Sequence, residues 1–309
     1  MGKHVVVGAG PVGSATARLL AERGEQVVVV TRTAASAAPL DGVQRLRLDA
    51  SDAQALAAAA EGAEVLYNCA NPQYHRWPEA WPPLAAALLA AAEHSGAVLA
   101  TVSNLYGYGA VDGPMSPDTP LRPVSAKGEV RAAMWRDALA AHEAGRVRAT
   151  EVRGSDYLAP NAVGMLDDRA FSRALAGRTV QVIGDPDAPH SWTAPQDVAR
   201  LLAVVGIDER AWGRAWHVPS NPPRSQRQVV AELCAAAGRP AAKVTGIPRP
   251  VLALLGLANP TIRAARETAY QFERPFVLDD TATRETFGLA PTPWEDMLAG
   301  IAAAHPGQA

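Results

Sequence analysis

The stretch Val5-Val6-Val7-Gly8-Ala9-Gly10-Pro11-Val12-Gly13 decides the fold of this chain. Its β-branched run predicts a buried strand, its G-x-G-x-x-G spacing predicts a tight turn, and a helical pattern follows from Ala15. Such a turn lets the backbone approach a pyrophosphate, and free N–H groups at the helix N-terminus attract the negative charge. We therefore predict a dinucleotide site made by Gly8, Gly10, Pro11, Val12 and Gly13.

The end of the next predicted strand indicates which dinucleotide binds. This strand runs from Gln26 to Val30 and continues into Thr31, Arg32 and Thr33. An NAD site usually has an acid here, which accepts hydrogen bonds from the ribose 2′-OH. No acid is present, and Arg32 has the planar fork that binds a 2′-phosphate. The sequence favours NADP(H) over NAD(H), with a solvated loop arginine as the alternative interpretation.

The composition is that of a globular enzyme-sized chain with 309 residues, a net charge of -2, 48% hydrophobic residues and 19% charged residues. The absence of a basic surplus argues against nucleic acid as a partner, and no apolar run is long enough to cross a membrane. Because the chain opens directly into a strand, we expect no signal peptide and a cytoplasmic protein. Cys69 and Cys234 give neither a disulfide framework nor metal spacing, so no metal site is expected.

Strands and helices alternate through the first half of the chain. Strands are expected at 26–30, 43–48, 65–67, 98–102 and 147–153, with helices at 52–60, 81–93 and 127–142 between them. This alternation predicts an α/β fold with a Rossmann-type, doubly wound parallel sheet. Ligands bind such sheets at the carboxyl ends of the strands.

The second half is less regular and richer in proline. We expect a dinucleotide-binding domain over 1–155, and over 156–309 the remaining sheet elements interleaved with a smaller substrate-binding lobe. The expected elements there are strands at 180–183 and 215–218 and helices at 195–205, 225–237, 248–257, 261–271 and 293–304.

Several motifs occur in a characteristic order along the chain. After the glycine turn come Leu48-Asp49, Asn68-Cys69-Ala70, Thr101-Val102-Ser103-Asn104-Leu105-Tyr106-Gly107, Lys127, and the segment 190–199. In this order the sequence resembles the extended short-chain dehydrogenase/reductase family, the NAD(P)-dependent epimerase/dehydratase group. The resemblance implies that Asp49, Asn68 and Ala70 contact the cofactor, that Ser103 holds the reacting oxygen, and that Lys127 binds the nicotinamide ribose.

The chain departs from this family at the catalytic pair. The family uses Tyr-x-x-x-Lys on one helical face, where the lysine lowers the pKa of the tyrosine. Four residues before Lys127 stands Pro123, which has no proton to give. In one interpretation Tyr106 is the acid, with Tyr108, Tyr157 or His75 as alternatives. In the other, the redox site is lost and the protein is a non-catalytic NADP-binding sensor or scaffold.

The loop from Ala70 to Pro78 is a candidate substrate wall. Tyr74, His75 and Trp77 combine flat apolar surfaces with a polar group, although a rigid proline-bounded loop explains the same pattern. Further substrate candidates are Tyr157 and Trp192. We expect an NADP(H)-dependent oxidoreductase acting on a small organic carbonyl, alcohol or activated double bond, with a nucleotide-sugar epimerase or dehydratase as an alternative. Family analogy implies a homodimer.

Overall fold

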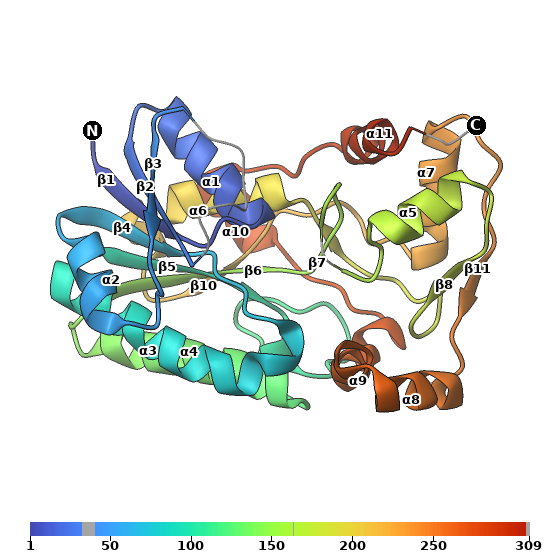
Figure 1. The fold of residues 1–309 in the computed structure, drawn as a ribbon, viewed down its shortest axis with the longest axis horizontal. Helices are drawn as coiled ribbons and strands as arrows, with labels where there is room; N and C mark the ends of the chain where they lie inside the picture. Colours follow the sequence, from blue (N-terminus) through green and yellow to red (C-terminus); the bar gives the residue numbers. More distant parts are fainter. Residues whose placement is uncertain (33–40, 163, 307–309) are drawn as a thin grey trace.

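A seven-stranded parallel sheet lies at the centre of the fold, in the order β10-β6-β5-β4-β1-β2-β3 (Figure 1). The structure is a computed structural model and describes residues 1–32, 41–162 and 164–306. The strands are β1 (Lys3–Val7), β2 (Gln26–Thr31), β3 (Val43–Arg47), β4 (Ala63–Asn68), β5 (Val98–Asn104), β6 (Arg148–Gly154) and β10 (Ala215–His217). The predicted α/β fold with a parallel, doubly wound sheet is confirmed.

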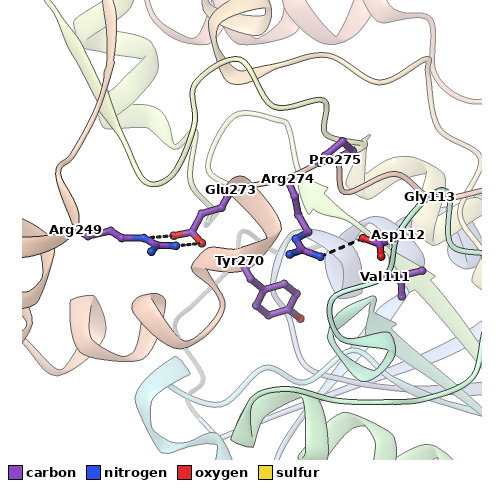
Figure 2. A pocket seen from close by; sticks show the side chains of 8 residues that line it. All are labelled: Val111, Asp112, Gly113, Arg249, Tyr270, Glu273, Arg274 and Pro275. Carbon is purple, nitrogen blue, oxygen red and sulfur yellow. Dashed lines mark hydrogen bonds and ion pairs between the residues drawn. The ribbon is translucent and has the colours of Figure 1, made fainter.

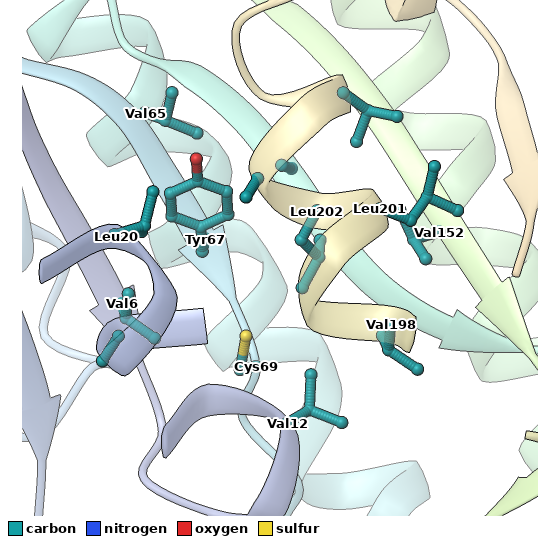
Figure 3. Packing of buried hydrophobic residues seen from close by; sticks show 14 of the residues in the cluster. Val6, Val12, Leu20, Val65, Tyr67, Cys69, Val152, Val198, Leu201 and Leu202 are labelled. Atoms are coloured by element: carbon teal, nitrogen blue, oxygen red, sulfur yellow. The ribbon is translucent and has the colours of Figure 1, made fainter. Parts of the chain in front are cut away.

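Helices cover both faces of this sheet (Figure 1). One face carries α1 (Pro11–Glu22) and α6 (Pro195–Val205), and the other carries α2 (Ala53–Ala60), α3 (Trp77–Ser95) and α4 (Ala126–Glu143). Alternate strand residues point to opposite faces, so Val6 packs beneath α1 and α6 while Val5 and Val7 pack toward α3. Figure 3 shows the first of these cores between α1, α6 and the sheet.

The helix boundaries follow local capping chemistry, with one difference from the sequence prediction. Ser125 begins α4 because its hydroxyl accepts a hydrogen bond from the Gly128 amide at 3.0 Å. Helix α3 begins at Trp77, four residues before the predicted start, and contains Pro82 and Pro83. Pro78 lies in its first turn, where a preset φ and a missing N–H are tolerated. Trp77 therefore belongs to a helix and not to the preceding loop.

The second lobe has its own hydrophobic core, packed among α5 (Asp168–Leu175), α7 (Gln226–Ala236) and α11 (Trp294–Ala304). Two short parallel pairs accompany it: β8 (Val180–Val182) with β11 (Val244–Gly246), and β7 (Asp156–Tyr157) with β9 (Trp192–Thr193). Sequence patterning did not predict α5, β7, β9 or β11. The two-residue strands β7 and β9 are too short to show a period.

The chain then forms a helical hairpin beneath this lobe (Figure 1). It consists of α8 (Arg249–Ala258) and α9 (Pro260–Glu267), followed by the short helix η4 (Ala269–Phe272) and by α10 (Thr281–Phe287) beside β10. The predicted helix over 261–271 thus ends at Glu267. Among the described residues, no helix is long and apolar enough to cross a membrane, and no group of three His, Cys, Asp or Glu side chains is placed to hold a metal.

Candidate active site

The glycine turn is tightly packed on one side and open on the other. Gly8 has φ +105°, which favours glycine, and a Cβ on Gly13 would lie 2.0 Å from the carbonyl oxygen of Gly8. A Cβ on Gly10 would meet nothing within 4 Å. Because Gly10 is the N-cap of α1, this open space lies at the N-terminus of the helix. The turn fits a pyrophosphate, which needs close backbone approach and exposed N–H groups.

Polar groups at neighbouring strand ends lie where the cofactor's ribose and base are expected. Asn68 ends β4, and its side-chain oxygen accepts a hydrogen bond from the Ala70 amide at 3.3 Å. Hydrogen bonds from Ser51, with the nearby charge of Arg32, hold the pKa of Asp49 below its usual value. Arg32 is exposed just beyond Thr31, the last residue of β2. Thr33 lies outside the described residues.

Two tyrosines from separate loops meet at the carboxyl edge of the sheet. Tyr74 lies in η1 (Tyr74–Arg76), Tyr106 lies in η2 (Tyr106–Tyr108), and the Tyr74 hydroxyl donates to the Tyr106 hydroxyl at 3.3 Å. The Gln271 side-chain amide also donates to Tyr106, at 3.5 Å, and Thr268 bonds Tyr74 at 2.7 Å. Burial raises the pKa of Tyr106 well above its usual value, so this phenol stays protonated.

Lys127 is buried beneath the C-terminal hairpin. Its ammonium lies 2.6 Å from the Glu267 carboxylate, 3.2 Å from the carbonyl oxygen of Ala264, and 4.7 Å from the centre of the Tyr74 ring. The backbone N–H of Lys127 donates to the same carboxylate at 3.1 Å. Sequence analysis missed Glu267 because 140 residues separate it from Lys127, and no local pattern marks the contact.

The start of α4 shows that Pro123 does not occupy the helical position of the family's catalytic tyrosine. Pro123 precedes the N-cap Ser125 and lies outside the helix, so it does not share a helical face with Lys127. Near the start of α4, Lys127 and Arg131 are four residues apart and both buried, so they share a helical face. The helical spacing argument therefore relates Lys127 to Arg131. Ser125, a residue that favours the N-cap position, was the sequence feature that could have predicted where α4 begins.

Arg131 is a buried cation held mainly by aromatic rings. Its guanidinium lies 4.5 Å from the Trp77 ring and 4.3 Å from the Trp81 ring, and one terminal nitrogen donates to the Val102 carbonyl at 3.3 Å. The buried Nε has no hydrogen-bond partner within the described residues. Burial lowers the pKa of Arg131 to about 10. No sequence motif had pointed to this residue.

The other sequence-predicted residues divide into two groups. Ser103 is buried near the end of β5 and Tyr157 is in β7, so both lie at the carboxyl edge. His75 is exposed. Trp77 and Trp192 are buried, and their indole N–H groups donate to the carbonyls of Pro72 and Arg224. The structure thus brings Tyr74, Tyr106 and Lys127 together. The Trp192 ring packs against His190 instead, with the ring centres 4.8 Å apart.

Asp156 and His190 form a pair at this edge that sequence analysis did not identify. The Asp156 carboxylate lies 3.0 Å from Nε2 of His190. The negative charge of Asp156 also acts on four nearby tyrosines. Burial is the main cause that raises their pKa values, and the Asp156 charge adds to it at Tyr74, Tyr106, Tyr157 and Tyr270. A carboxylate therefore borders the tyrosine cluster.

A cleft of about 410 Å³ opens around Tyr270 (Figure 2). It is lined by Val111, Asp112, Gly113, Arg249, Tyr270, Glu273, Arg274 and Pro275. The Tyr270 ring lies between two ion pairs, Arg249–Glu273 at 2.6 Å and Arg274–Asp112 at 3.4 Å (Figure 2). The Tyr270 hydroxyl is buried and has no hydrogen-bond partner in the described part of the chain. Burial, and after it the charges of Tyr74 and Asp156, raises the pKa of Tyr270.

Residues 4–211 match a family model described as the NAD dependent epimerase/dehydratase family. The fold is similar to UDP-glucose 4-epimerase from Thermotoga maritima, with 16% identity, 98% of each chain covered and a TM-score of 0.80. The Thermus thermophilus UDP-glucose 4-epimerase complex with NAD gives 20% identity, covers 99% of this chain and 100% of that one, and has a TM-score of 0.78.

The dTDP-glucose 4,6-dehydratase of Streptomyces venezuelae, solved as a double mutant with NAD bound, is also similar. It gives 19% identity, covers 99% of this chain and 97% of that one, and has a TM-score of 0.76. No curated protein sequence matches the chain.

Proposed function

The chain belongs to the NAD-dependent epimerase/dehydratase family, and from this premise we propose that it is an NADP(H)-dependent oxidoreductase acting on a small organic carbonyl, alcohol or activated double bond. The family match confirms the resemblance seen in the sequence and the expectation of a nicotinamide-dependent enzyme. The observation that carries the finer proposal is the open space above Gly10, at the same edge of the sheet as the buried cluster of Tyr74, Tyr106 and Lys127.

The residues of the cofactor site support a bound dinucleotide. When bound, the nicotinamide exchanges a hydride with the substrate. The turn from Gly8 to Gly13 would hold the pyrophosphate, and Asn68 would border the nicotinamide side. The preference for NADP(H) rests on Arg32, which is exposed at the end of β2 where no acid stands. The similar solved structures named above carry NAD in two cases, so this preference needs a direct test.

We propose that Lys127 and Arg131 occupy the two helical positions that Tyr-x-x-x-Lys occupies in the family. The support is the register of α4, which places both side chains on one buried face. Neither residue has a hydroxyl, so the groups beside the reacting oxygen are Ser103 and Tyr106. Tyr106 accepts two hydrogen bonds, and its own proton is free to donate to the substrate. Its raised pKa favours holding the oxygen over giving up the proton.

The test combines cofactor binding with turnover. Calorimetry with NADPH and NADH should give a lower Kd for NADPH. Absorbance at 340 nm should then show NADPH consumption with at least one member of a panel of aldehydes, ketones, quinones and enones. Tight binding without turnover on any member would contradict the proposal and favour the sensor. Conversion of UDP-glucose without net NADPH consumption would favour an epimerase.

A further inference from the structure

The buried histidine His190 has hydrogen-bond acceptors on both sides of its ring. Nδ1 lies 3.2 Å from the carbonyl oxygen of Gln271, and Nε2 lies 3.0 Å from the carboxylate of Asp156. A carbonyl oxygen only accepts, and so does an ionised carboxylate, whereas a neutral imidazole has a single N–H. Both contacts are hydrogen bonds at the same time only when the pair of Asp156 and His190 holds one proton more than a neutral ring beside a carboxylate.

A second buried histidine, His217 in β10, shows the opposite arrangement. Its Nε2 lies 2.7 Å from the Tyr108 hydroxyl, whose oxygen accepts from Arg153 at 2.6 Å, and its Nδ1 lies 2.9 Å from the carbonyl oxygen of Asp279. A neutral ring that accepts at Nε2 and donates at Nδ1 satisfies every partner. Burial lowers the pKa of His217 to about 3, in agreement with a neutral ring.

The rings around His190 favour a positive charge. Phe272 lies with its ring centre 4.6 Å away at 17°, and Phe276 lies 5.4 Å away at 20°. The faces of aromatic rings carry partial negative charge and attract a cation, most strongly where water is excluded. His190 is only 1% exposed. These stacked rings therefore stabilise an imidazolium at this position.

The pair also has a route to the tyrosine cluster. The Asp156 side chain is 13% exposed, whereas the His190 side chain is 1% exposed, so the carboxylate is the accessible end of the pair. Gln271 contacts both groups, because its carbonyl accepts from His190 and its side-chain amide donates to Tyr106. Asp156 follows β6 directly, at the edge of the sheet where parallel folds bind ligands.

We propose that the Asp156–His190 pair holds the proton that is delivered to the reacting oxygen of the substrate. This inference rests on the proposed oxidoreductase function. In the reducing direction, hydride from the reduced nicotinamide adds to the carbonyl carbon while the C=O π electrons move to oxygen. The pair's proton then forms the new O–H bond. A neutral imidazole and a carboxylate remain, and their lone pairs face each other until water returns a proton.

The titratable groups facing the pair are Tyr74, Tyr106, Tyr157 and Tyr270. Burial raises the pKa of each of them above its usual value, so none ionises near neutral pH. Ser155, whose hydroxyl lies 3.4 Å from Nε2, does not titrate in that range.

Nuclear magnetic resonance of ¹⁵N-histidine-labelled protein counts the protons on the ring without any turnover. In the wild type at pH 7, both nitrogens of His190 should carry protons. Asp156→Asn should convert the ring to a neutral Nδ1–H form, since an amide can donate to Nε2. A neutral His190 in the wild type would overturn the proposal, and this result does not depend on the identity of the substrate.

The kinetic test uses a matched pair elsewhere in the chain. His305 has the same contacts as His190, with Nδ1 2.8 Å from the Ile301 carbonyl and Nε2 3.1 Å from Asp168, but it lies in the second lobe. Asp156→Asn should lower kcat about a hundredfold or more, the range for a lost general acid, with the Kd for NADPH unchanged within about twofold. Asp168→Asn should leave kcat unchanged.

Equal loss of kcat in the two variants, or full kcat in Asp156→Asn, would overturn the assignment. Thermal unfolding of each variant separates a folding defect from a chemical one. A wild-type protein that binds NADPH yet reduces no carbonyl would overturn the proposed function, whereas the ring protonation measured by resonance would still decide whether the pair holds the extra proton.

Discussion

Single residues in the glycine turn have opposite surroundings, although they lie three positions apart. Gly13 is in contact with the backbone of Gly8, whereas Gly10 faces open space. Adding the same methyl group to each separates the packing role of the turn from its ligand-binding role. The contrast matters because loss of cofactor binding alone does not distinguish a blocked site from a damaged fold.

We predict that Gly13→Ala lowers the free energy of unfolding by about 1–3 kcal/mol, the usual cost of overpacking, because its Cβ would overlap the Gly8 carbonyl. It should also abolish the thermal shift caused by NADPH. Gly10→Ala should unfold at the wild-type temperature yet bind NADPH more weakly. Thermal unfolding with and without NADPH measures both effects. An unchanged unfolding temperature in Gly13→Ala would contradict the packing argument.

Arg32→Ala should separate the two cofactors. A lost charge-assisted hydrogen bond costs about 1.5–3 kcal/mol, so we expect the Kd for NADPH to rise on the order of tenfold to a hundredfold while the Kd for NADH changes little. Arg18→Ala removes an exposed arginine from α1 and serves as the control. Calorimetric titrations supply the values. An equal rise for both nucleotides would remove the 2′-phosphate assignment.

Tyr106→Phe should lower kcat on the order of tenfold or more and leave the Kd for NADPH unchanged. The hydroxyl is proposed to hold the reacting oxygen, and its removal also takes away the oxygen that accepts from Tyr74 and Gln271. Initial rates over a range of substrate concentrations give kcat and KM separately. A wild-type kcat in this variant would show that another hydroxyl holds the reacting oxygen, and Ser103 would be tested next.

At the scale of elements, the end of α9 closes over the start of α4. The Glu267 carboxylate binds both the backbone amide and the ammonium of Lys127, so one acidic side chain satisfies a helix N-terminus and neutralises a buried cation. Thr268 extends the contact to Tyr74. The C-terminal hairpin is therefore fastened to the sheet domain at the candidate active site.

Glu267→Ala should lower the free energy of unfolding by about 1–3 kcal/mol. A fully buried ion pair that loses one partner costs about 3–5 kcal/mol, and the 28% exposure of the Glu267 side chain reduces this. Glu129→Ala breaks the exposed pair with Arg136 and should cost about 0–1 kcal/mol. Urea unfolding compares the two. Similar losses of unfolding free energy in the two variants would show that the Lys127–Glu267 contact contributes no more than a surface ion pair.

The elements at the start of the chain have the clearest sequence pattern. The β-branched runs of β1 and β2 and the glycine turn between them marked the parallel sheet before any contact was known. The two-residue strand β7 was not found because its pairing with β9 leaves no period in the sequence. Contacts such as Lys127–Glu267 depend on how distant segments pack, so the partners of the site residues were beyond local patterns.

At the scale of the whole molecule, a buried neutral histidine links stability to pH. The pKa of His217 is about 3 in the folded protein because burial disfavours its charged form, against about 6.5 when unfolded. Between these values the unfolded chain binds more protons. This contribution to stability is therefore complete above pH 6.5 and decreases as the pH falls toward 3.

Lowering the pH from 6.5 to 4.5 should reduce the free energy of unfolding by about 2–3 kcal/mol through His217 alone, at about 1.4 kcal/mol per pH unit. His217→Gln should show a correspondingly shallower dependence on pH. Urea unfolding at pH 7.0, 5.5 and 4.5 measures both slopes. Parallel slopes in the two proteins would contradict a neutral His217 in the fold.

The chain returns to the central sheet at β10, and this limits where the protein can be cut into independent fragments. β10 pairs with β6 and α6 packs beside α1, so residues beyond 155 complete the dinucleotide-binding sheet. A fragment cut there would present a bare strand edge and an uncovered apolar face, which invites association with other chains. The second lobe therefore cannot be exchanged as a unit by recombination at a single junction.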